Sequence, residues 1–199
     1  MKLTRREFNA MNNPFRRMFQ RLVEYPNFRR MGMRDERCDI LEIGCGSGYG
    51  AQLLSQMRPH SYEGIDLMPE QIALAQKRGL KGYIFRVGDA TQLSSIPDQS
   101  KDLIVIFGVL HHIPEWRKAV RECGRILRNG GKLFLEEPNG GALRIWDRVF
   151  HWDHATNGIF YLQDLEQELA DNNLSIRQQV KGPGFGVYAA QKELTVQKK

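Results

Sequence analysis

The sequence lacks a long run of apolar residues. Its longest, Leu103 to Leu110, contains eight residues, whereas a helix that crosses a bilayer needs about 20. The first residues are basic and polar and do not contain the apolar core of a secretory signal. From these absences we expect a cytoplasmic protein with no membrane-spanning segment.

Cysteine is scarce and is not arranged in pairs. The chain has three cysteines, Cys38, Cys45 and Cys123. An odd number without a C-x-x-C pair predicts neither a disulfide framework nor a zinc cluster. His151 and His154, with Asp153 between them, supply too few ligands for a metal site. We therefore expect no bound metal.

Excess charge is absent from most of the chain. Residues 1–37 hold 10 basic and four acidic residues, which accounts for the whole net charge of +6. In this segment apolar residues recur at helical spacing, with Pro14 able to begin a helix and Pro26 expected to interrupt it. We interpret residues 1–37 as a basic amphipathic helical arm and residues 38–199 as a single domain.

After the arm, short apolar strands alternate with helical segments. This alternation implies right-handed crossovers and a doubly wound sheet. Near the C-terminus, Gly182-Pro183-Gly184 separates two strands that add a hairpin to the sheet. The expected strands are 40–43, 61–66, 83–87, 103–107, 132–136, 175–180 and 186–191, and the expected helices are 50–57, 69–78, 114–127 and 162–172.

The first strand ends in a glycine-rich segment, from Gly44 to Gly50, that turns directly into a helix. Such a turn presents backbone N–H groups to a ligand, and glycine allows the ligand a close approach. The segment also satisfies the G-x-G-x-x-G/A pattern of dinucleotide-binding proteins, so the pattern alone does not select the cofactor.

Acidic residues near the ends of successive strands narrow this choice. Asp66 ends the second strand, where a carboxylate can accept both hydroxyls of an adenosine ribose. Asp89 follows the third strand, within reach of an adenine amino group. Glu42 lies just inside the first strand, where its carboxylate would repel a pyrophosphate but suits a cationic ligand. The set favours a cofactor that combines adenosine with positive charge.

Together with two later motifs, these residues resemble the class I S-adenosylmethionine-dependent methyltransferases, in particular the methyltransferase type 11 group. The resemblance extends from Asp39 to Lys192. It implies an α/β, Rossmann-like, doubly wound sheet of seven strands, mostly parallel with an antiparallel C-terminal strand. The motifs are Leu41-Glu42-Ile43-Gly44-Cys45-Gly46-Ser47-Gly48, Gly64-Ile65-Asp66, Gly88-Asp89-Ala90, Leu110-His111-His112-Ile113 and Leu127-Arg128-Asn129-Gly130-Gly131-Lys132-Leu133.

The resemblance also implies S-adenosyl-L-methionine as cofactor and assigns residues to its parts. The methionine part would lie against Glu42, Gly44, Cys45, Gly46 and Gly48. Asp66 would bind the ribose, and Leu67 or Met68 would cover one face of the adenine. Asp89 and Ala90 would contact the adenine edge, and Phe107 and Gly108 would close the pocket near the transferable methyl group.

The methyl acceptor is less constrained. Methyl transfer mainly requires acceptor and methyl group to be held in line, and a base is needed only where the acceptor must lose a proton. His112 follows the fourth strand and is the candidate base, although the His-His pair could instead bond locally. Residues 138–160 form the acceptor-side connection, in which Trp146, Phe150 and Trp152 either contact a hydrophobic acceptor or belong to the core.

Two specialised acceptor signatures are absent. No Asn/Asp-Pro-Pro-Tyr/Phe segment follows the fourth strand, and no Pro-Cys pair is present for a covalent cytosine mechanism. We therefore expect a small-molecule acceptor, with a non-catalytic cofactor-binding module and an RNA methyltransferase as alternatives. The arm would correspondingly cap the acceptor pocket, contact an anionic membrane surface, or bind nucleic acid. Capping is favoured, because the remaining chain contains no recognisable nucleic-acid module.

Overall fold

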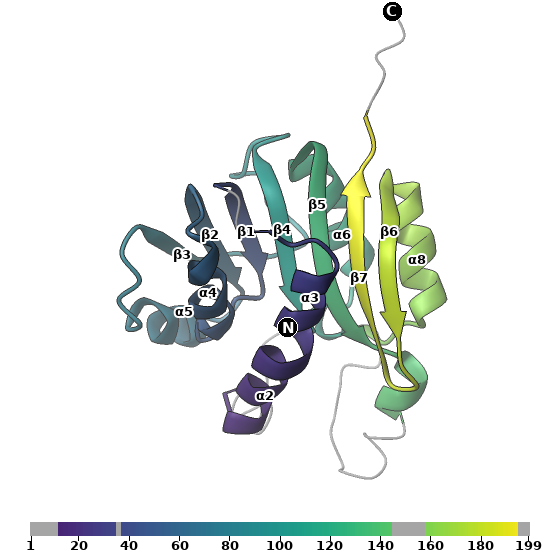
Figure 1. Ribbon diagram of the computed structural model, residues 1–199, viewed down its shortest axis with the longest axis horizontal. Coiled ribbons are helices and arrows are strands. Elements are labelled where there is room, and N and C mark those ends of the chain that lie inside the picture. Colours follow the sequence, from purple (N-terminus) through teal and green to yellow (C-terminus); the bar gives the residue numbers. More distant parts are fainter. Residues whose placement is uncertain (1–11, 35–36, 145–157, 195–199) are drawn as a thin grey trace, which may run out of the picture.

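The computed structural model describes residues 12–34, 37–144 and 158–194. Their seven strands form one sheet in the order β3-β2-β1-β4-β5-β7-β6 (Figure 1). The strands are β1 (Asp39–Ile43), β2 (Ser61–Asp66), β3 (Tyr83–Val87), β4 (Lys101–Phe107), β5 (Leu127–Pro138), β6 (Leu174–Lys181) and β7 (Phe185–Lys192). The expected seven-stranded α/β sheet is confirmed.

Strand direction changes only at β7. Strands β1 to β5 pair in parallel, whereas β7 runs antiparallel to both β5 and β6. The strand order reverses between β1 and β4, because β2 and β3 lie on one side of β1 and β4 and β5 on the other. Ligands of open α/β sheets bind outside the carboxyl ends of the strands at such a switch point. This edge of the sheet is therefore where a site is expected.

The sheet has a hydrophobic core on each face. Along β4, Leu103 and Val105 belong to one buried cluster, and Ile104 and Ile106 belong to the other. Successive side chains of a strand point to opposite faces, so an unbroken apolar strand can serve both cores. This explains why the most apolar stretch of the sequence occupies the middle of the sheet.

Helices cover both faces. In Figure 1, α3 crosses the face turned toward the viewer, while α6 and α8 lie behind β5, β7 and β6. The helices that correspond to the expected ones are α4 (Tyr49–Leu54), α5 (Pro69–Gln76), α6 (Trp116–Ile126) and α8 (Leu162–Asp171). They begin and end within three residues of the expected positions, and Ser55–Met57 continues α4 as a 3-10 turn. The largest strand difference is at β5, which starts at Leu127 instead of Lys132.

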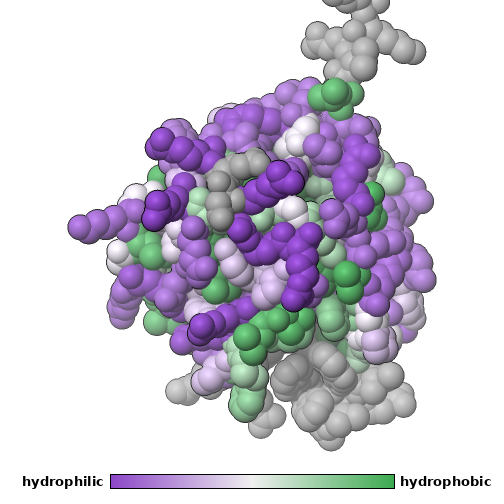
Figure 2. Space-filling model, viewed as in Figure 1, coloured by the Kyte–Doolittle hydropathy of each residue, from purple (hydrophilic) through white to green (hydrophobic). Residues whose placement is uncertain are grey.

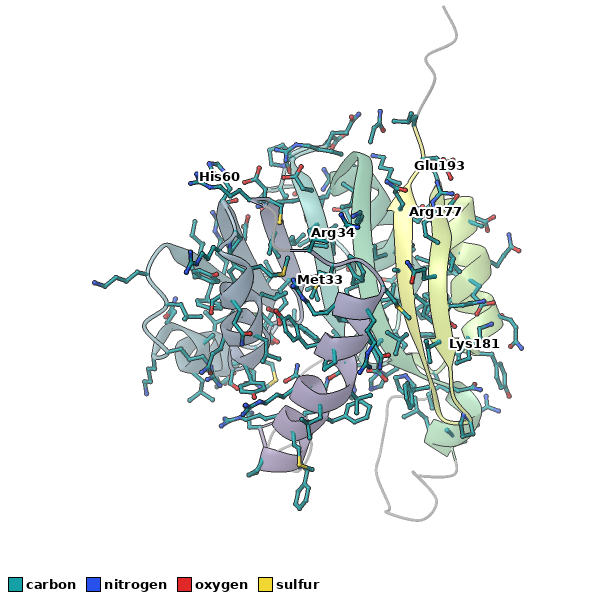
Figure 3. All side chains as sticks on the ribbon, in the orientation of Figure 1. Met33, Arg34, His60, Arg177, Lys181 and Glu193 are labelled. Atoms are coloured by element: carbon teal, nitrogen blue, oxygen red, sulfur yellow. The ribbon has the colours of Figure 1, made fainter. Side chains whose placement is uncertain are left out.

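The arm forms a helical segment that packs on the sheet. It comprises α2 (Pro14–Phe19), the π-helical η1 (Gln20–Glu24) and α3 (Tyr25–Arg30). The expected interruption at Pro26 takes the form of this π-helical segment, which ends where the Tyr25 N–H bonds to the Gln20 carbonyl. Phe28 of α3 is fully buried and contacts the rings of Phe107 and Phe134. Figure 3 shows how the chain then passes over the sheet at Met33 and Arg34.

Candidate functional site

A cavity of about 310 Å³ lies at the carboxyl ends of the central strands, within the size range of small-molecule sites. Its walls come from the glycine loop after β1, from the ends of β2 and β3, from the segment after β4, and from the arm. It therefore forms at the switch point of the sheet.

The glycine loop has a backbone that requires glycine. Gly44, Gly46 and Gly48 all have positive φ, with values of 68°, 51° and 77°. A Cβ atom at Gly44 would lie 2.5 Å from both γ-carbons of Val109, so the loop and the segment after β4 are in direct contact. At Gly46 an added Cβ would meet no atom within 4 Å. The backbone there borders open space in the cavity, as a loop that cradles a cofactor must.

Asp66 joins the glycine loop to the end of β2. One carboxylate oxygen accepts from Gly46 N–H at 2.9 Å, and the other accepts from Met68 N–H at 2.9 Å. Burial raises the pKa of Asp66, although these two hydrogen bonds oppose the increase. Because a carboxylate has about four acceptor positions, two remain for ligand hydroxyls. Asp66 lines the cavity and can bind a diol.

The next wall contains the residues expected around an adenine ring. Leu67 and Met68 after β2, and Asp89 and Ala90 after β3, all line the cavity. Asp89 accepts hydrogen bonds from both the backbone N–H and the hydroxyl of Thr91, at 2.8 and 2.7 Å. Burial alone would raise the pKa of Asp89, but these bonds lower it. The side chain is thus held ionised at the cavity edge.

Glu42 lies beneath the loop and is not among the cavity-lining residues. Its carboxyl group is buried and accepts a hydrogen bond of 2.5 Å from the Tyr62 hydroxyl. Burial raises its pKa to about 8. A Cβ atom at Gly50 would lie 2.1 Å from this carboxyl, so Gly50 allows the helix to start directly above it. Glu42 thus lies directly below the start of α4 and outside the cavity wall.

The segment after β4 supplies the wall next to the glycine loop. Phe107, Val109, His112 and Ile113 line the cavity, and they present two aliphatic side chains, one phenyl ring and one imidazole. Gly108 does not line it. A Cβ atom at Gly108 would come within 2.9 Å of a Glu136 oxygen, so its role is to leave room behind the wall.

Glu137 of β5 holds this segment in place. Its buried carboxylate accepts from the backbone N–H groups of Val109, Leu110 and His111 at 2.9, 2.8 and 3.3 Å. A further contact of 2.9 Å joins it to Nδ1 of His111. Burial raises the pKa of Glu137 to about 7, although the backbone bonds oppose the increase. The two histidines therefore differ: His111 bonds to the protein, and His112 lines the cavity.

The arm contributes a wall that the sequence motifs did not identify. Arg16, Arg17 and Gln20 line the cavity. The Arg16 guanidinium pairs with Glu24, with one N–O distance of 3.0 Å, and donates to the Phe107 carbonyl at 2.8 Å. Burial alone would lower the pKa of Arg16, but Glu24 raises it above its usual value. The amphipathic spacing of the arm was the available signal, but it could not specify which side faces the site.

Two carboxyl groups meet Arg16 in this buried network. Glu24 is fully buried and hydrogen-bonds to Glu136, which is 5% exposed. Burial and the adjacent Glu24 raise the pKa of Glu136 well above its usual value. Arg16 thus compensates the charge of Glu24 while it contacts the end of β4, and the raised pKa keeps the carboxyl of Glu136 protonated.

The cavity brings together most of the predicted site residues. Gly44, Cys45, Gly46, Asp66, Leu67, Met68, Asp89, Ala90, Phe107 and His112 line it, whereas Glu42, Gly48 and Gly108 do not. The candidate acceptor residues Trp146, Phe150 and Trp152, and the pair His151 and His154, lie outside the described residues. Within residues 12–34, 37–144 and 158–194, no group of three or more metal-binding side chains occurs. None of the helices in these ranges has the length and apolarity needed to cross a membrane.

Comparison with known proteins agrees with this arrangement. Residues 41–135 match the family model described as a methyltransferase domain. A probable S-adenosylmethionine-dependent methyltransferase of Mycolicibacterium smegmatis is 35% identical over 112 residues, which are 56% of this chain and 42% of that protein. The phthiotriol/phenolphthiotriol dimycocerosates methyltransferase of Mycobacterium leprae is 37% identical over 116 residues, which are 57% of this chain and 41% of that protein. The chain thus aligns with about two fifths of the length of these relatives.

The fold is also shared with solved structures. An S-adenosylmethionine-dependent methyltransferase from Aquifex aeolicus superposes with a TM-score of 0.74 at 17% identity, covering 96% of this chain and all of that one. The family-model match over residues 41–135 and the named relatives support a class I S-adenosylmethionine-dependent methyltransferase domain, and the solved structure shares its fold. S-adenosyl-L-methionine is the methyl donor of this class, and the glycine loop, Asp66 and the cavity volume fit a ligand of that kind.

Proposed function

We propose that the chain transfers a methyl group from S-adenosyl-L-methionine to a small acceptor with a hydrophobic body. One observation carries the proposal: a single cavity joins a glycine loop and a diol-binding carboxylate to an apolar wall that carries an imidazole. The glycine loop and the carboxylate suit the donor, and the apolar wall suits an acceptor. When bound, the donor supplies a methyl group that its sulfonium activates toward displacement.

The donor side of the cavity binds and orients. Asp66 would accept the ribose hydroxyls with the acceptor positions that Gly46 and Met68 leave available. Met68 and Ala90 are buried side chains that line the cavity and would contact the adenine. Glu42 would favour positive charge above the loop once its carboxyl is ionised. These residues hold the donor before any chemical step, which is the main contribution expected of the protein.

The acceptor side would be the wall after β4. Val109 and Ile113 offer aliphatic contact area next to Phe107, which suits an apolar acceptor. For an alcohol or a protonated amine, His112 would take the proton, because it is the imidazole in that wall. Trp146, Phe150 and Trp152 remain candidates for further acceptor contacts. The Mycobacterium leprae relative is named as a methyltransferase of phthiotriol/phenolphthiotriol dimycocerosates, in keeping with a small-molecule acceptor.

The donor is tested by calorimetry with the full chain. S-adenosylmethionine and S-adenosylhomocysteine are expected to bind, and NAD is expected not to bind measurably. Binding of NAD alone would overturn the proposal, because the glycine pattern is shared with dinucleotide-binding proteins.

The reaction is tested by methyl turnover on a panel of acceptors. Hydrophobic alcohols, phenols and amines are compared with polar analogues of the same group, with radiolabelled donor as the readout. Turnover of the hydrophobic members is expected. Tight donor binding without turnover on any acceptor would favour a non-catalytic binding module instead. Turnover confined to RNA, with binding that weakens steeply as salt rises, would favour the RNA alternative.

A further inference from the structure

The outer side of the arm exposes large apolar side chains. Phe15, Met18 and Leu22 have exposed fractions of 75%, 51% and 63%. They are three and four residues apart, which places them on one face of the helical segment. In Figure 2 hydrophobic surface gathers at the lower end of the visible face, where Figure 1 shows α2. We define Phe15, Met18 and Leu22 as the apolar stripe.

The stripe does not serve the packing of the domain. The arm is held to the sheet by other residues, mainly Arg16, which donates to the Phe107 carbonyl, and the buried Phe28. Among the described residues, the other exposed large apolar side chains belong to other segments of the chain: Leu67, Leu74, Ile84, Val87, Tyr161, Val180 and Leu194. The stripe is therefore a concentrated apolar face on an element that is already anchored.

The charge around the stripe is positive. Arg21 is exposed and lies between Met18 and Leu22 in the sequence. Residues 1–37 carry the whole net charge of +6. A helix with exposed Phe, Met and Leu next to arginine is typical of segments that lie in a lipid interface, where apolar side chains enter the acyl boundary and cations meet anionic headgroups.

We propose that the apolar stripe docks the protein on an anionic lipid surface. A second copy of the chain is a poorer occupant for two reasons. Its arm would bring the same positive charge to the contact, and three side chains cover far less than the roughly 800 Å² per partner of a stable interface. Anionic lipid satisfies both the apolar and the electrostatic character of the face.

Docking in this way would orient the cavity toward the lipid. Arg16, Arg17 and Gln20 line the cavity from the same two turns that carry the stripe. An acceptor dissolved in the lipid would then need to travel only the width of the arm. The inference rests on the surface of the arm, however, and does not depend on the proposed acceptor or on methyl transfer.

Vesicle flotation with the full chain tests the proposal. Wild-type protein is expected to float with vesicles of phosphatidylcholine and phosphatidylglycerol, and much less with phosphatidylcholine alone. The triple variant Phe15→Ser, Met18→Ser and Leu22→Ser should bind the anionic vesicles more weakly than wild type by about tenfold at least. The matched control, Leu74→Ser with Val180→Ser, removes exposed apolar groups elsewhere and should bind like wild type.

Further measurements separate the possible outcomes. Circular dichroism and S-adenosylhomocysteine binding of the triple variant show that it is folded. Arg21→Glu should weaken binding to anionic vesicles while leaving any residual binding to neutral ones unchanged. Equal flotation of the triple variant and wild type would overturn the proposal, because charge alone would then explain binding. The proposal would also be overturned if the wild-type protein did not float with vesicles and sedimentation showed it to be a dimer, with the triple variant a monomer.

Discussion

Arg16 is expected to be the most sensitive position of the arm. The change is Arg16→Met, which keeps the apolar length of the side chain and removes its charge. The structure predicts a large cost because Glu24 is fully buried and would lose the cation that it pairs with. The hydrogen bond to the Phe107 carbonyl at 2.8 Å would also be lost. Removing one partner of a buried pair costs about 3–5 kcal/mol.

A double-mutant cycle isolates the interaction. Arg16→Met combined with Glu24→Met replaces both charges by apolar groups of similar size, which is often close to neutral. The double variant is therefore expected to recover most of the loss, so the coupling between the two positions should be at least about 3 kcal/mol. The control is Arg21→Met on the same helix, which is exposed and should change stability by about 0.5 kcal/mol at most.

Urea denaturation followed by circular dichroism gives the free energies of unfolding. Hydrogen exchange of residues 14–30 shows whether the arm opens separately from the domain, in which case the loss appears there first. The reasoning is refuted if Arg16→Met costs less than about 1 kcal/mol and leaves exchange in the arm unchanged. It is also refuted if the two substitutions are additive, because Arg16 and Glu24 would then not interact.

Three further predictions concern the cavity. Asp66→Asn should weaken S-adenosylhomocysteine binding by about 1–3 kcal/mol in calorimetry; Asp171→Asn at the end of α8 is the control, and equal affinities would remove Asp66 from the site. Glu42 and Glu137 have pKa values raised to about 8 and about 7, so the native state binds more protons than the unfolded chain. The free energy of unfolding should fall as pH rises from about 5 to about 8. If this free energy had the same dependence on pH in Glu42→Gln as in wild type, the raised pKa assigned to Glu42 would be wrong. His112→Gln should lower kcat more than KM for an alcohol acceptor and remove an acidic limb from the pH profile; an unchanged profile would show that His112 is not the base.

The sequence was sufficient for the sheet because the relevant signals are local. Apolar runs such as Leu103 to Phe107 mark buried strands, and glycines with acidic residues mark the strand ends. The rule that parallel strands bind ligands at their carboxyl ends then brings Asp66 and Asp89 to one edge. These two residues do line one cavity, as do the glycines at 44 and 46.

The arm could not be predicted in the same way because its position depends on distant contacts. The sequence shows arginines on an amphipathic segment, but not that Arg16 reaches Phe107 across 91 positions. The placement of Glu42 has a similar cause. Its neighbours in the sequence suggest a ligand-facing carboxylate, whereas the Tyr62 hydroxyl on the adjacent strand holds it below the loop. Both outcomes depend on side chains brought close only by the fold.

The π-helical segment sets the rotational phase of the arm. In a regular α-helix, two residues eight positions apart differ by about 80° around the axis, so Arg16 and Glu24 would point in different directions. The wider turn of η1 accommodates one additional residue, which reduces the effective interval to seven positions and the difference to about 20°. The same residues in a regular α-helix would therefore turn Glu24 away from Arg16, whereas deleting a single residue between Gln20 and Val23 would restore α-helical geometry and keep the two halves of the arm in register. For this arm, the number of residues in the turn matters as much as which residues they are.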